Sequence, residues 1–166
     1  MKRIIFFTFI FVTLYNINSS AQIKTIPNFM LEGIDGKKYS LHEFLKEGPV
    51  YLCFWALWCI PCRAELKDLN SIQTMYKDKK VTILAINIDS PKSTAKVRSY
   101  VSTQKFNFKV LLDPNSNLFE TLSGKNLPYS LLVNQNGEII KTRNSYLPGD
   151  KQSIIEDFDQ ILKSIK

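Results

Sequence analysis

The apolar run from Pro49 to Ala56 constrains the fold of this chain most, because a helical pattern follows it almost at once. A nearly continuous apolar run of this length is typical of a central strand that is buried on both faces of a sheet. Apolar residues at helical spacing then predict a helix from about Cys59 to Tyr76 (Leu66, Leu69, Ile72 and Met75). A buried strand that leads directly into a helix indicates an α/β sheet.

The rest of the chain alternates between strand and helix patterns. Turn signals at Asp35-Gly36 and at Asn136-Gly137 predict paired strands near both ends, so the sheet is expected to be mixed. We therefore predict one α/β domain over residues 22–166, a central mixed β-sheet flanked by helices. The further strands are expected at 28–31, 38–41, 81–88, 108–112, 131–133 and 138–141, and the further helices at 91–104, 115–122 and 150–165.

The first 21 residues have the layout of a secretory signal peptide. Lys2 and Arg3 precede an apolar run, and a polar stretch with small residues then leads to a predicted cleavage after Ala21. The apolar run is well short of the roughly 20 residues that a membrane-spanning helix needs. We expect a periplasmic or otherwise extracytoplasmic protein. The alternative is an uncleaved membrane anchor, and only then is membrane contact expected.

The charge of the chain gives no sign of a nucleic-acid partner. There are 22 Lys and Arg residues against 15 Asp and Glu residues, which gives a formal net charge of +7. The basic residues are scattered among acids and form no stripe with aromatic residues, so we interpret them as solvated surface.

Cys53, Cys59 and Cys62 lie within ten residues of one another, which is not the spacing of a stapling framework. A disulfide that closes so short a loop restrains the unfolded chain little. Structural zinc sites usually take their four ligands as two closely spaced pairs, and beyond the Cys59–Cys62 pair only the isolated Cys53 and His42 remain, with no second pair, so no metal is expected, and no cofactor. A redox-active pair is favoured over an inert disulfide or free buried thiols.

The position of Cys59 predicts a reactive thiol. The unpaired amides at the start of a helix carry partial positive charge, so a thiolate there is stabilised and the pKa of Cys59 should fall below the free value of about 8.5. Cys62 follows on the same helical face, and Pro61 is tolerated in the first turn because its missing amide has no helical partner there. We expect an exposed Cys59 to attack and a deeper Cys62 to resolve the mixed disulfide.

The segment Phe54-Trp55-Ala56-Leu57-Trp58-Cys59-Ile60-Pro61-Cys62-Arg63-Ala64-Glu65-Leu66 resembles the active-site segment of thioredoxin-fold thiol–disulfide oxidoreductases of the TlpA/ResA type, which are related to AhpC/TSA proteins. The resemblance covers nearly the whole chain after residue 21. It implies a thioredoxin fold with an N-terminal β-hairpin extension and an inserted helix–strand between residues 88 and 113.

The resemblance also implies roles for individual residues. Cys59 matches the nucleophile and Cys62 the resolving cysteine of a redox-active disulfide. Pro128 matches a cis-proline that faces the disulfide, and with Leu127 it would hold a substrate strand. Without the resemblance, a trans proline would be expected, because cis bonds are a small minority even before proline. Trp58 and Pro61 are expected to shape the surface that meets a partner.

Glu65 and Cys53 each have two interpretations. Glu65 matches an acid that in ResA-like proteins tunes the cysteine pKa values and relays protons, and the alternative is a solvated helix acid. Cys53 stands where thioredoxin has a buried acid. It is either a small buried hydrophobic residue or a third thiol able to trap Cys62 in another disulfide.

The resemblance implies an exported enzyme that reduces protein disulfides, for example during cytochrome c maturation. Its partners would be disulfide- or dithiol-containing proteins and an upstream electron donor. Three alternatives stay open: a thiol oxidase on the same fold, a peroxide-reducing relative, and a non-catalytic binding protein. The direction of electron flow depends on a reduction potential that residues alone do not give.

Overall fold

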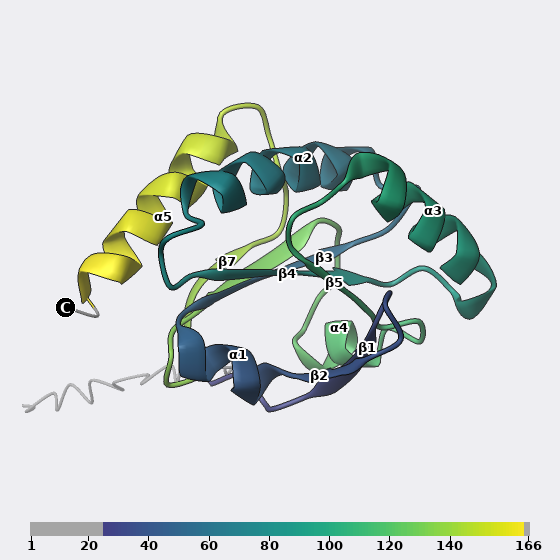
Figure 1. Cartoon of the computed structure of the whole chain (residues 1–166), viewed down its shortest axis with the longest axis horizontal. Coiled ribbons are helices and arrows are strands. Elements are labelled where there is room, and N and C mark those ends of the chain that lie inside the picture. The colour runs from purple at the N-terminus through teal and green to yellow at the C-terminus, as the bar shows by residue number, and fades with distance from the viewer. Residues whose placement is uncertain (1–24, 165–166) are drawn as a thin grey trace, which may run out of the picture.

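The computed structural model describes residues 25–164, so the predicted signal peptide lies outside the described residues. Seven strands form one sheet in the order β2-β1-β5-β4-β3-β6-β7, and helices cover it (Figure 1). The strands are β1 Met30–Gly33, β2 Lys38–Ser40, β3 Val50–Trp55, β4 Thr82–Asn87, β5 Lys109–Leu112, β6 Tyr129–Val133 and β7 Ile139–Arg143. The helices are α1 Leu41–Glu47, α2 Ile60–Met75, α3 Thr94–Gln104, α4 Asn117–Thr121 and α5 Asp150–Ser164.

The sheet is mixed, as the turn signals predicted. β3, β4 and β5 run parallel, while β6 and β7 on one side and β1 and β2 on the other are antiparallel to their neighbours. Every residue of β3 is buried, which confirms the central strand expected from the apolar run. Gly36 and Gly137, at the two hairpin turns, have φ angles of 79° and 80°, which glycine adopts without steric cost.

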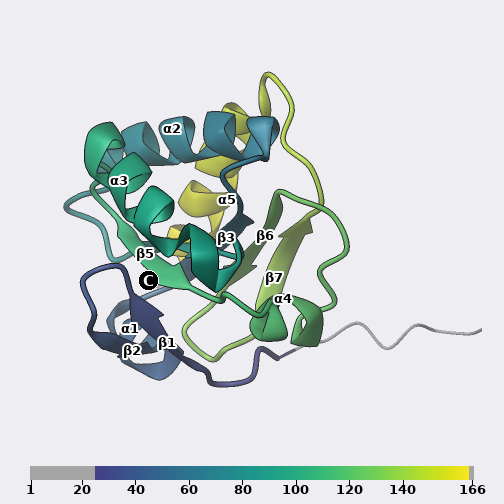
Figure 2. The same cartoon turned by 90° about the vertical axis from the view of Figure 1, so that its right-hand side faces the viewer.

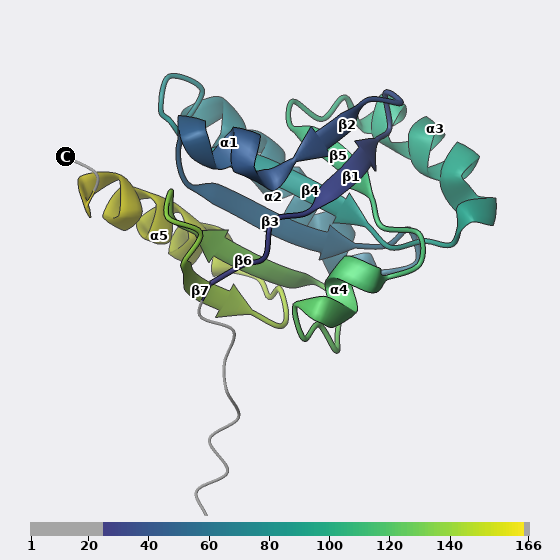
Figure 3. The same cartoon turned by 90° about the horizontal axis from the view of Figure 1, so that it is seen from below.

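Two apolar layers lie on opposite faces of the sheet. Helices α2, α3 and α5 cover one face, and Figures 1 and 2 show them on the same side in both views. Helices α1 and α4 lie over the other face, seen from below in Figure 3. Side chains of β3 alternate between the layers, so Tyr51, Cys53 and Trp55 pack toward α2 whereas Leu52 and Phe54 pack on the opposite side.

Helix α1 was not predicted. The expected strand 38–41 ends at Ser40, and the chain turns at Leu41 into a helix that buries Leu41 and Leu45 one turn apart. This short helix has only two buried apolar positions, so its periodicity is too weak to separate from a strand end. The other predicted boundaries differ from the observed ones by a few residues. The segment 91–104, expected as one helix, begins with a 3₁₀ turn at 91–93 and continues as α3.

The fold places the two cysteines of the Trp-Cys-x-Pro-Cys segment where β3 passes into α2. The parallel strands β3 and β4 end side by side, with Trp55 opposite Asn87. The loops beyond these carboxyl ends are where ligands and reactive groups collect in open α/β sheets.

Candidate active site

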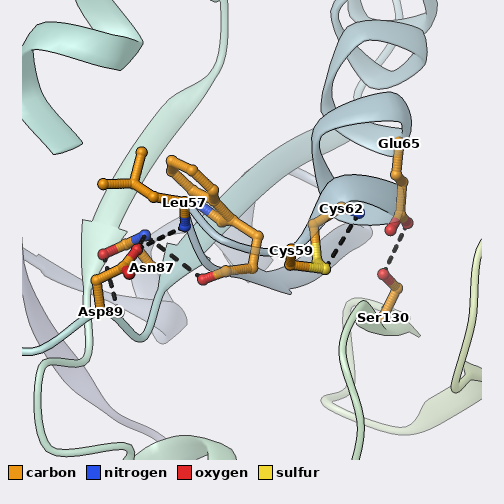
Figure 4. Close-up of a disulfide and its surroundings, with 8 residues drawn as sticks. Leu57, Cys59, Cys62, Glu65, Asn87, Asp89 and Ser130 are labelled. Atoms are coloured by element: carbon orange, nitrogen blue, oxygen red, sulfur yellow. Dashed lines mark hydrogen bonds between the residues drawn. A yellow bond between two sulfur atoms is a disulfide. The ribbon is translucent and has the colours of Figure 1, made fainter. Parts of the chain in front are cut away.

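Cys59 and Cys62 are joined by a disulfide at the start of α2, with their Cα atoms 5.3 Å apart. Cys59 is the residue that caps the helix, and its Sγ accepts a hydrogen bond of 3.2 Å from the backbone N–H of Cys62 (Figure 4). Side chains that accept from the first free amides of a helix satisfy donors that otherwise have no partner. The same geometry favours negative charge on Cys59 Sγ once the disulfide is reduced.

The disulfide is buried, and the expectation of an exposed Cys59 is wrong for this oxidised form. Cys59 is 4% exposed and Cys62 is fully buried. Both belong to the apolar layer under α2, against which Leu57 and Leu127 also pack. The residues on either side of Cys59 are exposed instead: Trp58 is 70% exposed and Ile60 is 71% exposed.

The remaining residues predicted to meet a partner are Pro61, Leu127 and Pro128. Pro61 is exposed in the first turn of α2. The peptide bond between Leu127 and Pro128 is cis, as the resemblance implies, and it comes directly before β6. Leu127 is partly buried against the layer that contains the cysteines, whereas Pro128 is buried.

Glu65 lies one helical turn beyond Cys62 and is 1% exposed, so its interpretation as a solvated acid is wrong. Tyr51 Oη donates a 2.9 Å hydrogen bond to Oε1 of Glu65, and Ser130 Oγ donates one of 2.8 Å to the same oxygen. The other oxygen, Oε2, is buried and has no hydrogen-bond partner among residues 25–164. Figure 4 shows Ser130 facing Glu65 beyond the disulfide.

Burial raises the pKa of the Glu65 carboxyl, although hydrogen bonds from Ser130 and Tyr51 oppose that rise. The same burial, together with the negative charge of an ionised Glu65, raises the pKa of Tyr51. A carboxyl with one unpartnered buried oxygen is stabilised as the neutral acid, because an ionised carboxylate needs donors for both oxygens.

Cys53 is a free, fully buried thiol in β3. Its neighbour across the sheet is Ser130, the residue that donates to Glu65. Burial raises the pKa of Cys53, and the nearby Glu65 raises it further. A thiol that is protonated and buried is a poor nucleophile, which favours the interpretation of Cys53 as a small core residue.

Sequence reasoning missed Tyr51 and Ser130 as partners of Glu65. Both lie in strands whose residues are all buried, and a hydroxyl in such a strand requires a partner. That signal is present in the sequence, but it does not say which residue the hydroxyl meets. The structure supplies that information, because both hydroxyls donate to Oε1 of Glu65.

A second polar cluster lies at the end of β4, on the other side of the disulfide from Glu65 in Figure 4. Asp89 Oδ2 accepts a 2.8 Å hydrogen bond from the backbone N–H of Leu57 and one of 2.7 Å from Asn87 Nδ2. In the sequence, Asp89 directly follows the strand predicted at 81–88, and nothing else distinguishes it. Its hydrogen bond spans 32 positions along the chain, and no local pattern reveals it.

Neither a membrane span nor a metal cluster is found in the described part of the chain. No helix within residues 25–164 is both long and apolar enough to cross a bilayer. Within the same range, no group of three or more His, Cys, Asp or Glu side chains is arranged to hold a metal ion.

Comparison with known proteins gives consistent matches. The AhpC/TSA family model matches residues 23–143. The thiol-disulfide oxidoreductase ResA of Halalkalibacterium halodurans is 30% identical over 136 residues, 82% of this chain and 74% of that protein.

Two crystal structures share the fold. One is of a Chlorobium tepidum protein assigned as the thiol:disulfide interchange protein DsbE, with a TM-score of 0.78 and 29% identity, covering 84% of this chain and 96% of that one. The other is the exposed lipoprotein thioredoxin Etrx1 of Streptococcus pneumoniae, with a TM-score of 0.69 and 30% identity, covering 81% and 99%.

Proposed function

This chain belongs to the AhpC/TSA family and is a thiol–disulfide oxidoreductase with a thioredoxin fold, and from that premise we propose that it reduces disulfide bonds of exported proteins through Cys59 and Cys62. The observation that carries the proposal is the position of Cys59 Sγ, which caps α2 and accepts the backbone N–H of Cys62. A thiolate at Cys59 keeps that donor and gains the favourable field of the helix terminus.

The first step forms a mixed disulfide. In the reduced enzyme, the Cys59 thiolate attacks one sulfur of the substrate disulfide, the substrate S–S bond breaks, and the departing substrate thiolate takes a proton. The bond between Cys59 and the substrate replaces the bond that was lost, so the step is an exchange with no external oxidant.

The second step releases the substrate. Cys62 loses its proton and attacks Cys59 Sγ, which frees the second substrate thiol and forms the Cys59–Cys62 disulfide seen in the structure. Two electrons have then passed from the enzyme to the substrate. The buried position of Cys62 supports its role as the resolving thiol, because a partner protein cannot easily reach it.

Glu65 is proposed to accept the proton that Cys62 loses. Its raised pKa fits an oxidised form in which the carboxyl holds that proton, and its place one turn beyond Cys62 supports a relay. Glu65→Gln should then slow the second step by roughly 10²-fold, so that the mixed disulfide accumulates, while the first step is unchanged. Equal rates for both steps in the variant and the wild type would remove Glu65 from the mechanism.

The substrate is proposed to lie across the exposed residues around the disulfide. Trp58 and Pro61 would contact its apolar side chains, and the backbone at Leu127 and Pro128 would hold an extended segment. Because Cys59 is 4% exposed, its Sγ must become accessible when the disulfide opens or when the partner docks.

The protein is proposed to act outside the cytoplasm, with residues 1–21 as a cleaved signal peptide and an upstream electron donor that restores the dithiol. The match to an exposed lipoprotein thioredoxin supports that location. Fractionation of cells that produce the full chain tests it. A mature protein that begins at Gln22 is expected in the extracytoplasmic fraction, and an unprocessed cytoplasmic protein would contradict the proposal.

The reduction potential of the Cys59–Cys62 pair tests the direction of transfer. In a dithiothreitol or glutathione series, a reductase should have a value toward about −270 mV, whereas a value near about −120 mV would favour a thiol oxidase. Cys62→Ser should trap mixed disulfides with substrate proteins. Cys59→Ser is the matched control, and it should trap none.

A further inference from the structure

The loop 56–58 between β3 and α2 determines where Cys59 stands, yet it belongs to no helix or strand. Two backbone hydrogen bonds act at its ends: Cys59 N–H donates to the carbonyl of Ala56 at 3.1 Å, and Ile88 N–H donates to the carbonyl of Trp55 at 3.0 Å. Neither of them holds the middle of the loop.

The middle of the loop is held by a buried carboxylate that lies just beyond the end of β4. Asp89 Oδ2 accepts the backbone N–H of Leu57 at 2.8 Å, and it also accepts Asn87 Nδ2 at 2.7 Å. Asn87 Oδ1 in turn accepts the backbone N–H of Asp89 at 3.2 Å, so the Asn87 side chain is bonded to both the side chain and the backbone of Asp89. Asn87 is 1% exposed and Asp89 is 9% exposed. Hydrogen bonds to an ionised acceptor are roughly twice as strong as neutral ones, and burial strengthens them further.

We propose that Asp89 and Asn87 are positioning residues that hold the loop 56–58, and through it Cys59, in place for disulfide exchange. The inference rests on the proposed function, because it concerns the same thiol. Figure 4 shows the arrangement: Asp89 and Asn87 lie beside Leu57, and the chain continues from there to Cys59. A thiol that must meet a substrate sulfur in line is sensitive to displacement, and an error of about 1 Å can cost up to 10²-fold in rate.

Asp113 provides a matched control. It follows β5, the next parallel strand, and is 3% exposed. Its Oδ2 also accepts one backbone N–H, from Phe119 at 2.9 Å. Phe119 lies in α4, on the face of the sheet opposite α2, and not in the loop that carries Cys59. Each aspartate therefore follows a parallel strand and accepts one backbone N–H from another segment, but only Asp89 bonds the loop that leads to Cys59.

Two substitutions at residue 89 separate position from charge. Asp89→Ala removes the acceptor for Leu57, and Asp89→Asn keeps an oxygen acceptor in its place but removes the negative charge. If the role is to position the loop, the asparagine variant should recover most of the activity that the alanine variant loses.

The experiment measures kcat/KM for reduction of insulin disulfides, the rate with hydroxyethyl disulfide, and the thermal midpoint of the oxidised protein. Asp89→Ala should lower kcat/KM about tenfold, whereas the kcat/KM of Asp89→Asn should stay within about twofold of the wild-type value. Asp113→Ala should lower the thermal midpoint as Asp89→Ala does, but its kcat/KM should be unchanged. If Asp89→Ala does not fold, Asn87→Ala, which removes one of the two donors to Asp89, should slow the reaction several-fold.

Two results would overturn the inference: an alanine variant at 89 no slower than Asp113→Ala, or an asparagine variant as slow as the alanine one. Should the wild type itself reduce neither disulfide, the proposed function fails instead, so the two failures are distinguishable.

Discussion

Ser130 donates a 2.8 Å hydrogen bond to Oε1 of Glu65, which ties the strand after the cis peptide bond to the helix that carries both cysteines. The segment proposed to hold the substrate and the helix proposed to perform the chemistry thus share one buried carboxyl. Tyr51 donates to the same oxygen from β3, the strand next to β6 in the sheet. A change in the protonation of Glu65 therefore alters the hydrogen bonds that join α2 to β3 and β6.

Glu65 should make the folded protein less stable as pH rises. Its pKa is raised in the folded state, so the native protein holds this proton more tightly than the unfolded chain, in which the value is about 4.3. The stabilisation is complete below about pH 4 and is lost as pH rises through the raised pKa. Each unit of difference corresponds to about 1.4 kcal/mol.

Urea unfolding of the oxidised protein across a pH series measures this effect. Glu65→Gln keeps an oxygen that can accept from Tyr51 and Ser130 and does not titrate. The unfolding free energy of the wild type minus that of the variant should fall as pH rises. A difference that is constant with pH would show that Glu65 does not titrate differently in the folded state.

Ser130→Ala should raise the pKa of Glu65 further, because the hydrogen bond from Ser130 lowers it. Loss of a buried hydrogen bond to a carboxyl should also cost about 1–3 kcal/mol of unfolding free energy. The pH at which stability is lost should move upward relative to the wild type. Ser130→Thr keeps the hydroxyl and is the matched control. Identical pH profiles for the alanine and threonine variants would refute the role of this hydroxyl.

Much of the fold was predictable, because the strongest signals were buried strands and glycine turns. The residues 49–56 marked β3, and Asp35-Gly36 and Asn136-Gly137 marked the two hairpins. Helix α1 was missed because two buried leucines in seven residues give little periodicity. Hydrophobic periodicity and turn residues are local features of a sequence, so the strands and turns that they mark could be predicted well.

The candidate site was predicted in part for the same reason. Cys59 and Cys62 lie three positions apart in one motif, so their pairing could be expected. Tyr51, Ser130 and Asp89 reach the site from separate strands, and each needs the sheet register to identify its partner. The burial of Cys59 was missed because it comes from the apolar layer under α2, whose members are contributed by several separate elements of the chain.

Cys53 should be dispensable for disulfide exchange. The thiol is fully buried and its pKa is raised, so the population of thiolate is small. Cys53→Ala should lower the unfolding free energy by about 1 kcal/mol through the small cavity it leaves, with kcat/KM within about twofold of the wild type. Peptide mapping of the oxidised wild type should give only the Cys59–Cys62 linkage. Detection of a Cys53–Cys62 linkage would restore the hypothesis of a third redox thiol.

Trp58 should contribute to recognition of protein partners and little to stability. Its side chain is 70% exposed beside a buried Cys59, so few contacts within the chain depend on it. Trp58→Ala should change the unfolding free energy by less than about 0.5 kcal/mol. Exposed tryptophans often contribute about 2 kcal/mol or more to an interface, so kcat/KM for insulin should fall at least tenfold. Activity on hydroxyethyl disulfide, which is too small to span the site, should stay within about twofold.

Met75 gives the matched control for Trp58. It is 60% exposed at the opposite end of α2, and so it is a large apolar side chain on the same helix but far from the disulfide. Met75→Ala should leave both activities unchanged. If Trp58→Ala slowed the small disulfide and insulin equally, Trp58 would act on the reactivity of Cys59. The surface that binds the partner would then have to lie elsewhere around the disulfide, with Ile60 as the next exposed apolar residue to test.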